Sequence, residues 1–187
     1  MVRKLAVSGC IALLALVVGC TGSSSTASRA ASGRVSAITA VSAASPCPAT
    51  GTKKFSRTLF VTDAGLVAGA FRKWIYTPYQ HGAFGKGVPG RSESIAKAGV
   101  AGQFVLSRLQ VVKVSAQSDP PLCKLTIGAI DKLTSTVRAM VTKARKGSVS
   151  KSQVTSAAAY LSRLQVASAE AHAAFKARSV SSLPSSD

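Results

Sequence analysis

The residues best suited to binding chemistry lie in one stretch, from Phe71 to Arg91. Its candidate ligand contacts are two tyrosines, a histidine and two cations: Tyr76, Tyr79, His81, Lys86 and Arg91. Aromatic faces flanked by cations can hold sugars, lipid headgroups or unstacked bases. The glycines between positions 82 and 90 predict a loop, and loops often carry binding residues. The stretch therefore predicts a stacking and cationic platform.

The same residues also fit a packing role. Phe71, Trp74 and Ile75 recur at helical spacing and would form the buried face of a helix. Tyr79 and Phe84 would then pack the loop onto the rest of the fold. We favour this packing role, and the five candidates above are the first to test if it is wrong.

The remaining polar residues show no catalytic pattern. The six acidic side chains contain no pair placed for acid–base work, and His81 and His172 lack the spacing of metal ligands. No nucleophile elbow accompanies the serines. Lys86 is not followed by Ser or Thr, so the glycine loop does not match a phosphate loop. We therefore expect no enzyme activity, no metal and no cofactor.

The first twenty residues have the pattern of an export signal. Two cations at positions 3 and 4 precede an apolar run over 5–18, a pattern read by the secretion machinery and then removed. Residues 16–20, Leu-Val-Val-Gly-Cys, resemble the lipobox of bacterial lipoproteins, whose cysteine is lipidated and becomes the mature N-terminus. The resemblance implies a signal peptide over 1–19 and a lipid anchor on Cys20. The protein would then sit on the outer face of the cytoplasmic membrane.

Three other interpretations of this region stay open. An uncleaved anchor would need about 20 apolar residues, and the run is shorter and lacks a basic flank after it. Cys10 could imitate the lipobox cysteine, but little apolar core would precede it. Cleavage elsewhere without lipidation would give a secreted protein.

Cys47 and Cys123 remain when Cys10 is removed with the signal and Cys20 carries lipid. Thiols outside the cytoplasm tend to be oxidised, so we expect these two to form a disulfide. Two cysteines so far apart, in a chain with two histidines, would make a poor zinc site.

The chain is strongly basic. It has 24 Lys and Arg against 6 Asp and Glu, a net charge of +18. Without the two cations of the signal, 22 basic side chains face 6 acidic ones, leaving +16. Such an excess attracts anionic lipid headgroups, acidic wall polymers or extracellular nucleic acid. Alternatively, the charge serves solvation and has no partner.

The folded part is predicted to be all-α. Residues 20–48 are rich in Ser, Ala and Thr and predict a flexible linker. Apolar residues at helical spacing predict helices from Ser56 or Thr62 to just before Pro78, over 92–116, from 120 to near 146, and over 150–178. Short connections predict a small antiparallel bundle of about four helices over 49–180, followed by a disordered tail over 181–187.

Local signals mark three places in this bundle. Asp119, followed by two prolines, predicts the start of the third helix. Ser150 and Gln153 fit a capping box at the start of the fourth. Gly65 and Gly69, four residues apart, predict the close approach of a neighbouring helix.

Three short segments carry a second resemblance. They are Ala-Phe-Arg-Lys-Trp-Ile-Tyr-Thr-Pro-Tyr over 70–79, Gly-Ala-Phe over 82–84 and Val-Pro-Gly-Arg over 88–91. Together they are similar to a family of uncharacterised secreted or lipid-anchored actinobacterial proteins. The resemblance covers most of the folded part from about Phe55 and implies location, not activity. We expect an exported cell-envelope lipoprotein that reaches the membrane through Cys20 and acts as a binding or structural module. A basic surface protein that binds an anionic envelope polymer is the alternative, and an enzyme of unrecognised class is third.

Overall fold

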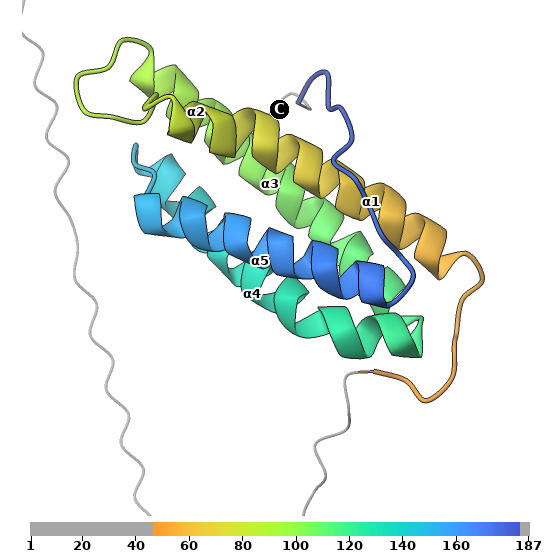
Figure 1. The fold of residues 1–187 in the computed structure, drawn as a ribbon. Helices are drawn as coiled ribbons and strands as arrows, with labels where there is room; N and C mark the ends of the chain where they lie inside the picture. The colour runs from red at the N-terminus through yellow and green to blue at the C-terminus, as the bar shows by residue number, and fades with distance from the viewer. Residues whose placement is uncertain (1–46, 184–187) are drawn as a thin grey trace, which may run out of the picture. The chain divides into compact units, whose positions relative to one another are not determined.

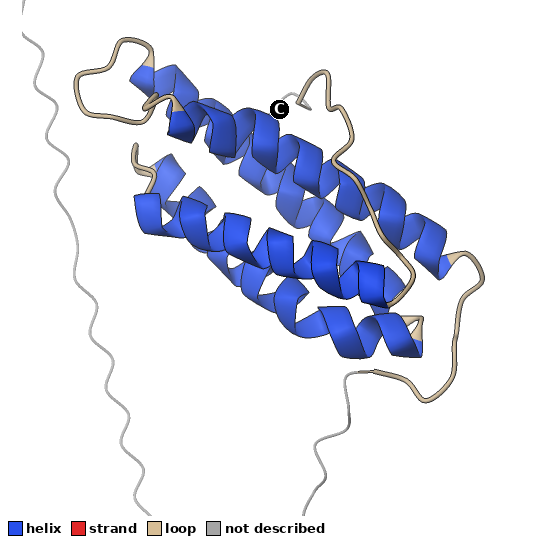
Figure 2. Cartoon of the chain, in the orientation of Figure 1, coloured by secondary structure: helices blue, strands red, loops and turns tan. Residues whose placement is uncertain are grey.

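The structure is a computed structural model that describes residues 47–183. The predicted signal peptide, Cys20 and most of the predicted linker lie outside the described residues. Within them the fold is all-α, as predicted, and no strand occurs (Figure 2). The elements are α1 (Ser56–Phe71), the π-helix η1 (Arg72–Tyr76), α2 (Thr77–Gln80), α3 (Arg91–Gln117), α4 (Pro120–Arg145) and α5 (Lys151–Glu170).

The helices form the expected bundle. α1, η1 and α2 follow one another as a single continuous rod, and α3, α4 and α5 supply the other three rods (Figure 1). α1 packs on α3, α3 on α4 and α4 on α5. All four rods contribute fully buried side chains to one core, among them Phe60, Leu109, Leu133 and Leu164. Over residues 47–183, no helix has the length and apolar character to cross a membrane.

The predicted disulfide is present and ties the start of the described chain to α4. Cys47 and Cys123 are bonded, with their Cα atoms 5.6 Å apart. The Thr52 N–H also donates to the Ser118 carbonyl at 3.0 Å, so this segment crosses the α3–α4 turn before α1 begins. α1 begins at Ser56, which settles the start that the sequence left open.

The fourth rod is shorter than its apolar pattern predicted. α5 ends at Glu170, and His172 adopts a left-handed backbone with φ of 57°. The chain then leaves the helix and runs back along α1 (Figure 1). Phe175 is buried as expected, but it lies beyond the helix, with its ring 6.2 Å from that of Phe60. Residues 171–183 are named here the C-terminal segment.

The two glycines of α1 accommodate this segment and not a neighbouring helix. The Arg178 N–H donates to the Gly65 carbonyl at 2.9 Å. A Cβ atom at Gly69 would overlap the Arg178 carbonyl, and one at Gly65 would lie 2.8 Å from the Lys176 carbonyl oxygen. The close approach predicted from the glycines is therefore real, but its partner is extended chain.

One of the two predicted helix caps forms. The Asp119 carboxylate accepts a hydrogen bond from the Leu122 N–H at 3.1 Å, as an N-cap should. The capping box at Ser150 is wrong, because the Ser150 hydroxyl lies 2.9 Å from that of Ser152 and caps no backbone N–H. Gln153 Oε1 is buried and has no hydrogen-bond partner among the described residues.

Candidate functional site

A cleft of about 360 Å³ lies between the far end of the first rod and α5. Its polar lining comes from Arg72, Thr77 and Gln80 on the first rod and from Ser162 and Gln165 on α5. Apolar side chains complete the wall, together with the Tyr76 ring and Ala177 of the C-terminal segment; they are Ala68, Phe71, Ala158 and Leu161. The cleft is thus amphipathic, with one cation and two amides.

The first rod reaches this cleft because Pro78 does not end it. A proline inside an α-helix lacks the N–H donor and clashes with the carbonyl four residues back. Here the helix widens over Arg72–Tyr76, and the Thr77 N–H donates to the Arg72 carbonyl, five residues back. Pro78 then falls in the first turn of α2, where a missing donor costs nothing. The prediction that the helix stops before Pro78 is therefore wrong, because a π-turn absorbs the proline.

The aromatic side chains of this region stack mainly on one another. The Tyr76 ring lies 6.2 Å from Phe71 in a stacked arrangement and 6.5 Å from Tyr79 in a tilted one. Phe71 is buried, and Trp74, Tyr76, Tyr79 and Phe84 are partly buried against the core. This agrees with the packing role favoured from the sequence. Tyr76 alone of the five predicted contacts also lines the cleft.

The other predicted contacts do not meet at one point. His81 and Lys86 are exposed on the loop after α2, and neither of them lines the cleft. Arg91 donates to the Phe84 carbonyl and the Gly147 carbonyl, both at 3.1 Å, so it fastens the loop to the α4–α5 connection. The predicted platform is thus a packed aromatic cluster with separate cations.

A second hollow of about 340 Å³ lies beside the first, across the C-terminal segment. Arg72, Thr77 and Ala177 line both hollows, and Lys73 lines the second. The Lys73 ammonium donates to the carbonyls of Val180 at 3.0 Å and Ser181 at 3.3 Å, and it lies 4.8 Å from the Trp74 ring. Lys73 therefore holds the C-terminal segment against the first rod.

Sequence reasoning missed most of the cleft. Arg72, Gln80, Ser162 and Gln165 were not among the predicted site residues. One signal was available, because Arg72, Tyr76 and Gln80 recur at every fourth position and so share a helix face. Ser162 and Gln165 of α5 had no such sequence signal, since their approach to this face depends on tertiary packing.

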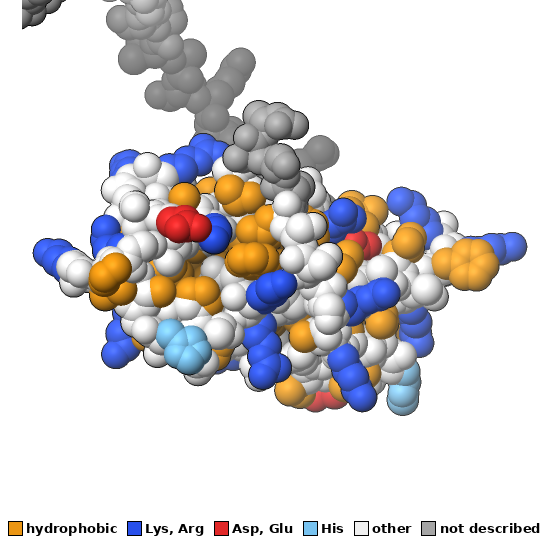
Figure 3. Space-filling view, turned by 90° about the horizontal axis from the view of Figure 1, so that it is seen from above, with side chains coloured by type: hydrophobic (Ala, Val, Ile, Leu, Met, Phe, Trp, Pro, Cys, Tyr) orange, Lys and Arg blue, Asp and Glu red, His pale blue; other side chains and the backbone are white. Residues whose placement is uncertain are grey.

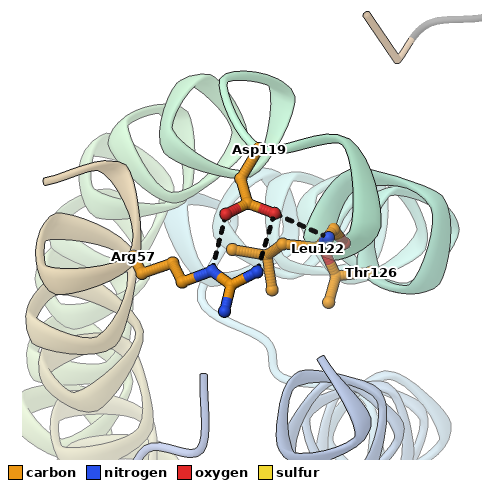
Figure 4. Close-up of polar contacts among 4 residues, drawn as sticks. All are labelled: Arg57, Asp119, Leu122 and Thr126. Atoms are coloured by element: carbon orange, nitrogen blue, oxygen red, sulfur yellow. Dashed lines mark hydrogen bonds and ion pairs between the residues drawn. The ribbon is translucent and has the colours of Figure 1, made fainter. Parts of the chain in front are cut away.

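The opposite end of the bundle holds a structural ion pair. Arg57 Nε donates to Asp119 Oδ2 at 2.6 Å, and Arg57 Nη2 lies 3.4 Å from Oδ1 (Figure 4). The hydrogen bond from Arg57, supported by that from the Leu122 N–H, lowers the pKa of Asp119 against the opposing effect of burial. Within residues 47–183 no group of three or more His, Cys, Asp or Glu could hold a metal.

Comparison with protein-family models, with curated proteins and with solved structures finds no match to this chain. The resemblances to the lipobox and to the actinobacterial family therefore remain predictions.

Proposed function

We propose that this protein is an exported lipoprotein of the bacterial cell envelope, anchored through Cys20, and that its bundle is a non-enzymatic binding or structural module on the outer face of the cytoplasmic membrane. The observation that carries the proposal is the disulfide between Cys47 and Cys123. Structural disulfides persist in oxidising compartments and are rare in the cytoplasm. The lipobox-like sequence supplies the anchor for the same location.

Cell fractionation tests this proposal with Cys20→Ala and a matched control, Cys10→Ala. The wild-type protein and Cys10→Ala should be in the membrane fraction and incorporate a labelled fatty acid. Cys20→Ala should incorporate none, because the acyl acceptor is gone. An unlabelled, uncleaved wild-type protein in the cytoplasm would contradict both the anchor and the export.

A second candidate function is the binding of an anionic envelope polymer. Four of the six acidic side chains are already held in ion pairs, by Arg57, Lys97, Arg108 and Lys113. Lys and Arg are spread over the face shown in Figure 3, where acidic side chains are few. The excess positive charge is therefore available to a polyanion.

α4 carries the densest group of these cations. Five exposed cations lie on its outer face, opposite the buried residues Leu133 and Val137, and a sixth is its C-cap: Lys124, Lys132, Arg138, Lys143 and Arg145, then Lys146. The one acidic residue on this side, Asp131, is paired with Lys113. We name this group the basic face of α4. Distributed cations of this kind bind phosphate-rich polymers without sequence or shape readout, and such binding weakens steeply with salt.

A further inference from the structure

We propose that the two hollows beside the C-terminal segment form one binding site for a sugar phosphate, with Arg72 as the residue that joins its halves. The inference rests on the proposed function in one respect, that the module binds a ligand and does not transform it. It does not depend on where in the cell the protein is located. The charge of one hollow, the polarity of the other and the position of Arg72 on both support a single site.

The hollow that contains Lys73 suits the phosphate. Its lining includes Arg72, Lys73 and Arg178 and no acidic residue. The Lys73 ammonium uses two donors on the Val180 and Ser181 carbonyls, and an ammonium has three. Thr77 and Ser179 add hydroxyls to the same wall. A dianionic oxyacid is therefore matched by the neighbouring cations Arg72 and Lys73, by Arg178 and by neutral donors.

Arg72 is available to this anion. Its side chain is exposed, and within the described part of the chain it makes no ion pair or hydrogen bond, whereas the four ion pairs use other cations. A guanidinium presents five N–H donors in a planar fork that fits phosphate oxygens. The π-turn places this exposed cation where it lines both hollows. We therefore expect Arg72 to make the main contact with the phosphate.

The hollow on the α5 side suits an uncharged polyhydroxy group. Its volume of about 360 Å³ falls within the range of small-molecule sites. Gln80 and Gln165 offer both donors and acceptors, Ser162 a hydroxyl, and the Tyr76 ring is held in place by its stacking on Phe71. Sugar hydroxyls can donate to the amide oxygens and accept from the amide N–H groups, while the faces of the sugar ring pack on apolar surface. Arg72 supplies the one charge in this hollow.

The C-terminal segment sets the distance between the halves. Ala177 lines both hollows together with Arg72 and Thr77 of the first rod, so this segment contributes a small side chain where the two hollows adjoin. The hydrogen bonds from Lys73 of η1 and from the Arg178 N–H to Gly65 of α1 hold the segment on the first rod. A ligand that places its phosphate against Arg72 and Lys73 can therefore extend past Ala177 into the neutral half.

Isothermal titration calorimetry on the full-length protein in detergent tests the site with glucose 1-phosphate, inorganic phosphate and glucose. We expect glucose 1-phosphate to bind more tightly than phosphate, and glucose to give no measurable heat. Arg72→Gln should weaken binding of glucose 1-phosphate at least tenfold, because it removes the charged fork. Lys86→Gln, which removes an exposed loop cation of equal charge, should leave affinity unchanged.

Gln165→Ala separates the two halves. This substitution should weaken the binding of glucose 1-phosphate and leave the affinity for inorganic phosphate unaltered. The site is overturned if the wild-type protein binds no glucose 1-phosphate, if Arg72→Gln binds it as tightly as the wild type, or if Lys86→Gln loses as much affinity as Arg72→Gln. Each of these results leaves the lipid anchor on Cys20 untouched, since fatty-acid labelling reports on it separately.

Discussion

Asp119 has two structural tasks that can be separated by substitution. It caps α4 through the Leu122 N–H and pairs with Arg57 on the first rod. Asp119→Ala removes both interactions and should lower the free energy of unfolding by about 1–2 kcal/mol, most of it from the cap. Asp119→Asn keeps a good cap and should cost less than half as much. Urea denaturation of the two variants measures the difference, and equal losses would contradict this division.

The ion pair also predicts a pH dependence. The pKa of Asp119 lies below its ordinary value of 3.8, first because of the hydrogen bond from Arg57. A carboxyl group with a lowered folded pKa stabilises the fold above its unfolded pKa, and that contribution is lost as the pH falls through the folded pKa. The stability gap between wild type and Asp119→Asn should therefore be constant near neutral pH and close as the pH falls from the ordinary pKa of 3.8 through the lowered folded pKa. A gap that widens on acidification would contradict the assigned direction.

At the scale of elements, Gly69 tests the contact between α1 and the C-terminal segment. Gly69→Ala introduces a Cβ that overlaps the Arg178 carbonyl, so the segment must move away from α1. We expect a loss of about 1–3 kcal/mol in unfolding free energy and faster tryptic cleavage at Lys176 and Arg178. Gly128→Ala is the control, because nothing lies within 4 Å of its Cβ position. It should stabilise α4 by up to about 1 kcal/mol.

The Cys47–Cys123 disulfide is a second link between separate parts of the fold. It closes a loop of 76 residues between the start of the described chain and α4. In the chain-entropy model a loop of that size stabilises the fold by about 4 kcal/mol. The double variant Cys47→Ser/Cys123→Ser should show a loss of this order in denaturant titration. The variant should also be insensitive to reducing agent, while the wild type should lose the same stability when reduced.

A single sequence carries clear signals for the long helices of this fold and few for its irregular parts. α3 and α4 agree with prediction to within a residue or two, because long apolar stripes and the Asp119 cap mark them. The ends of the first and fourth helices were predicted wrongly. A π-turn before Pro78 lets the first rod continue, and a left-handed backbone at His172 ends α5 before residues 171–178, and neither feature has a local sequence signal. Of the predicted site residues only Tyr76, in the aromatic stretch, lines the cleft, because Ser162 and Gln165 approach it through tertiary packing.

At the scale of the whole molecule, the excess of positive charge makes a prediction about salt. Polyphosphate should bind the wild-type protein at low salt, and the logarithm of the affinity should fall linearly with the logarithm of the salt concentration. Neutralising three cations of the basic face of α4, Lys124→Gln/Lys132→Gln/Arg138→Gln, should reduce the slope of that line. Neutralising Lys53, Lys54 and Lys86, which lie outside α4, is the matched control. Equal slopes in both triple variants would mean that the basic face has no special part.

The central claim is that the chain is exported, cut before Cys20, acylated there and oxidised. Intact-mass spectrometry of protein purified from its native membrane tests all four steps at once. The predicted mass is that of residues 20–187 plus a lipid group, less two hydrogens for the Cys47–Cys123 bond. A mass equal to residues 1–187 with reduced cysteines and no lipid would contradict the account.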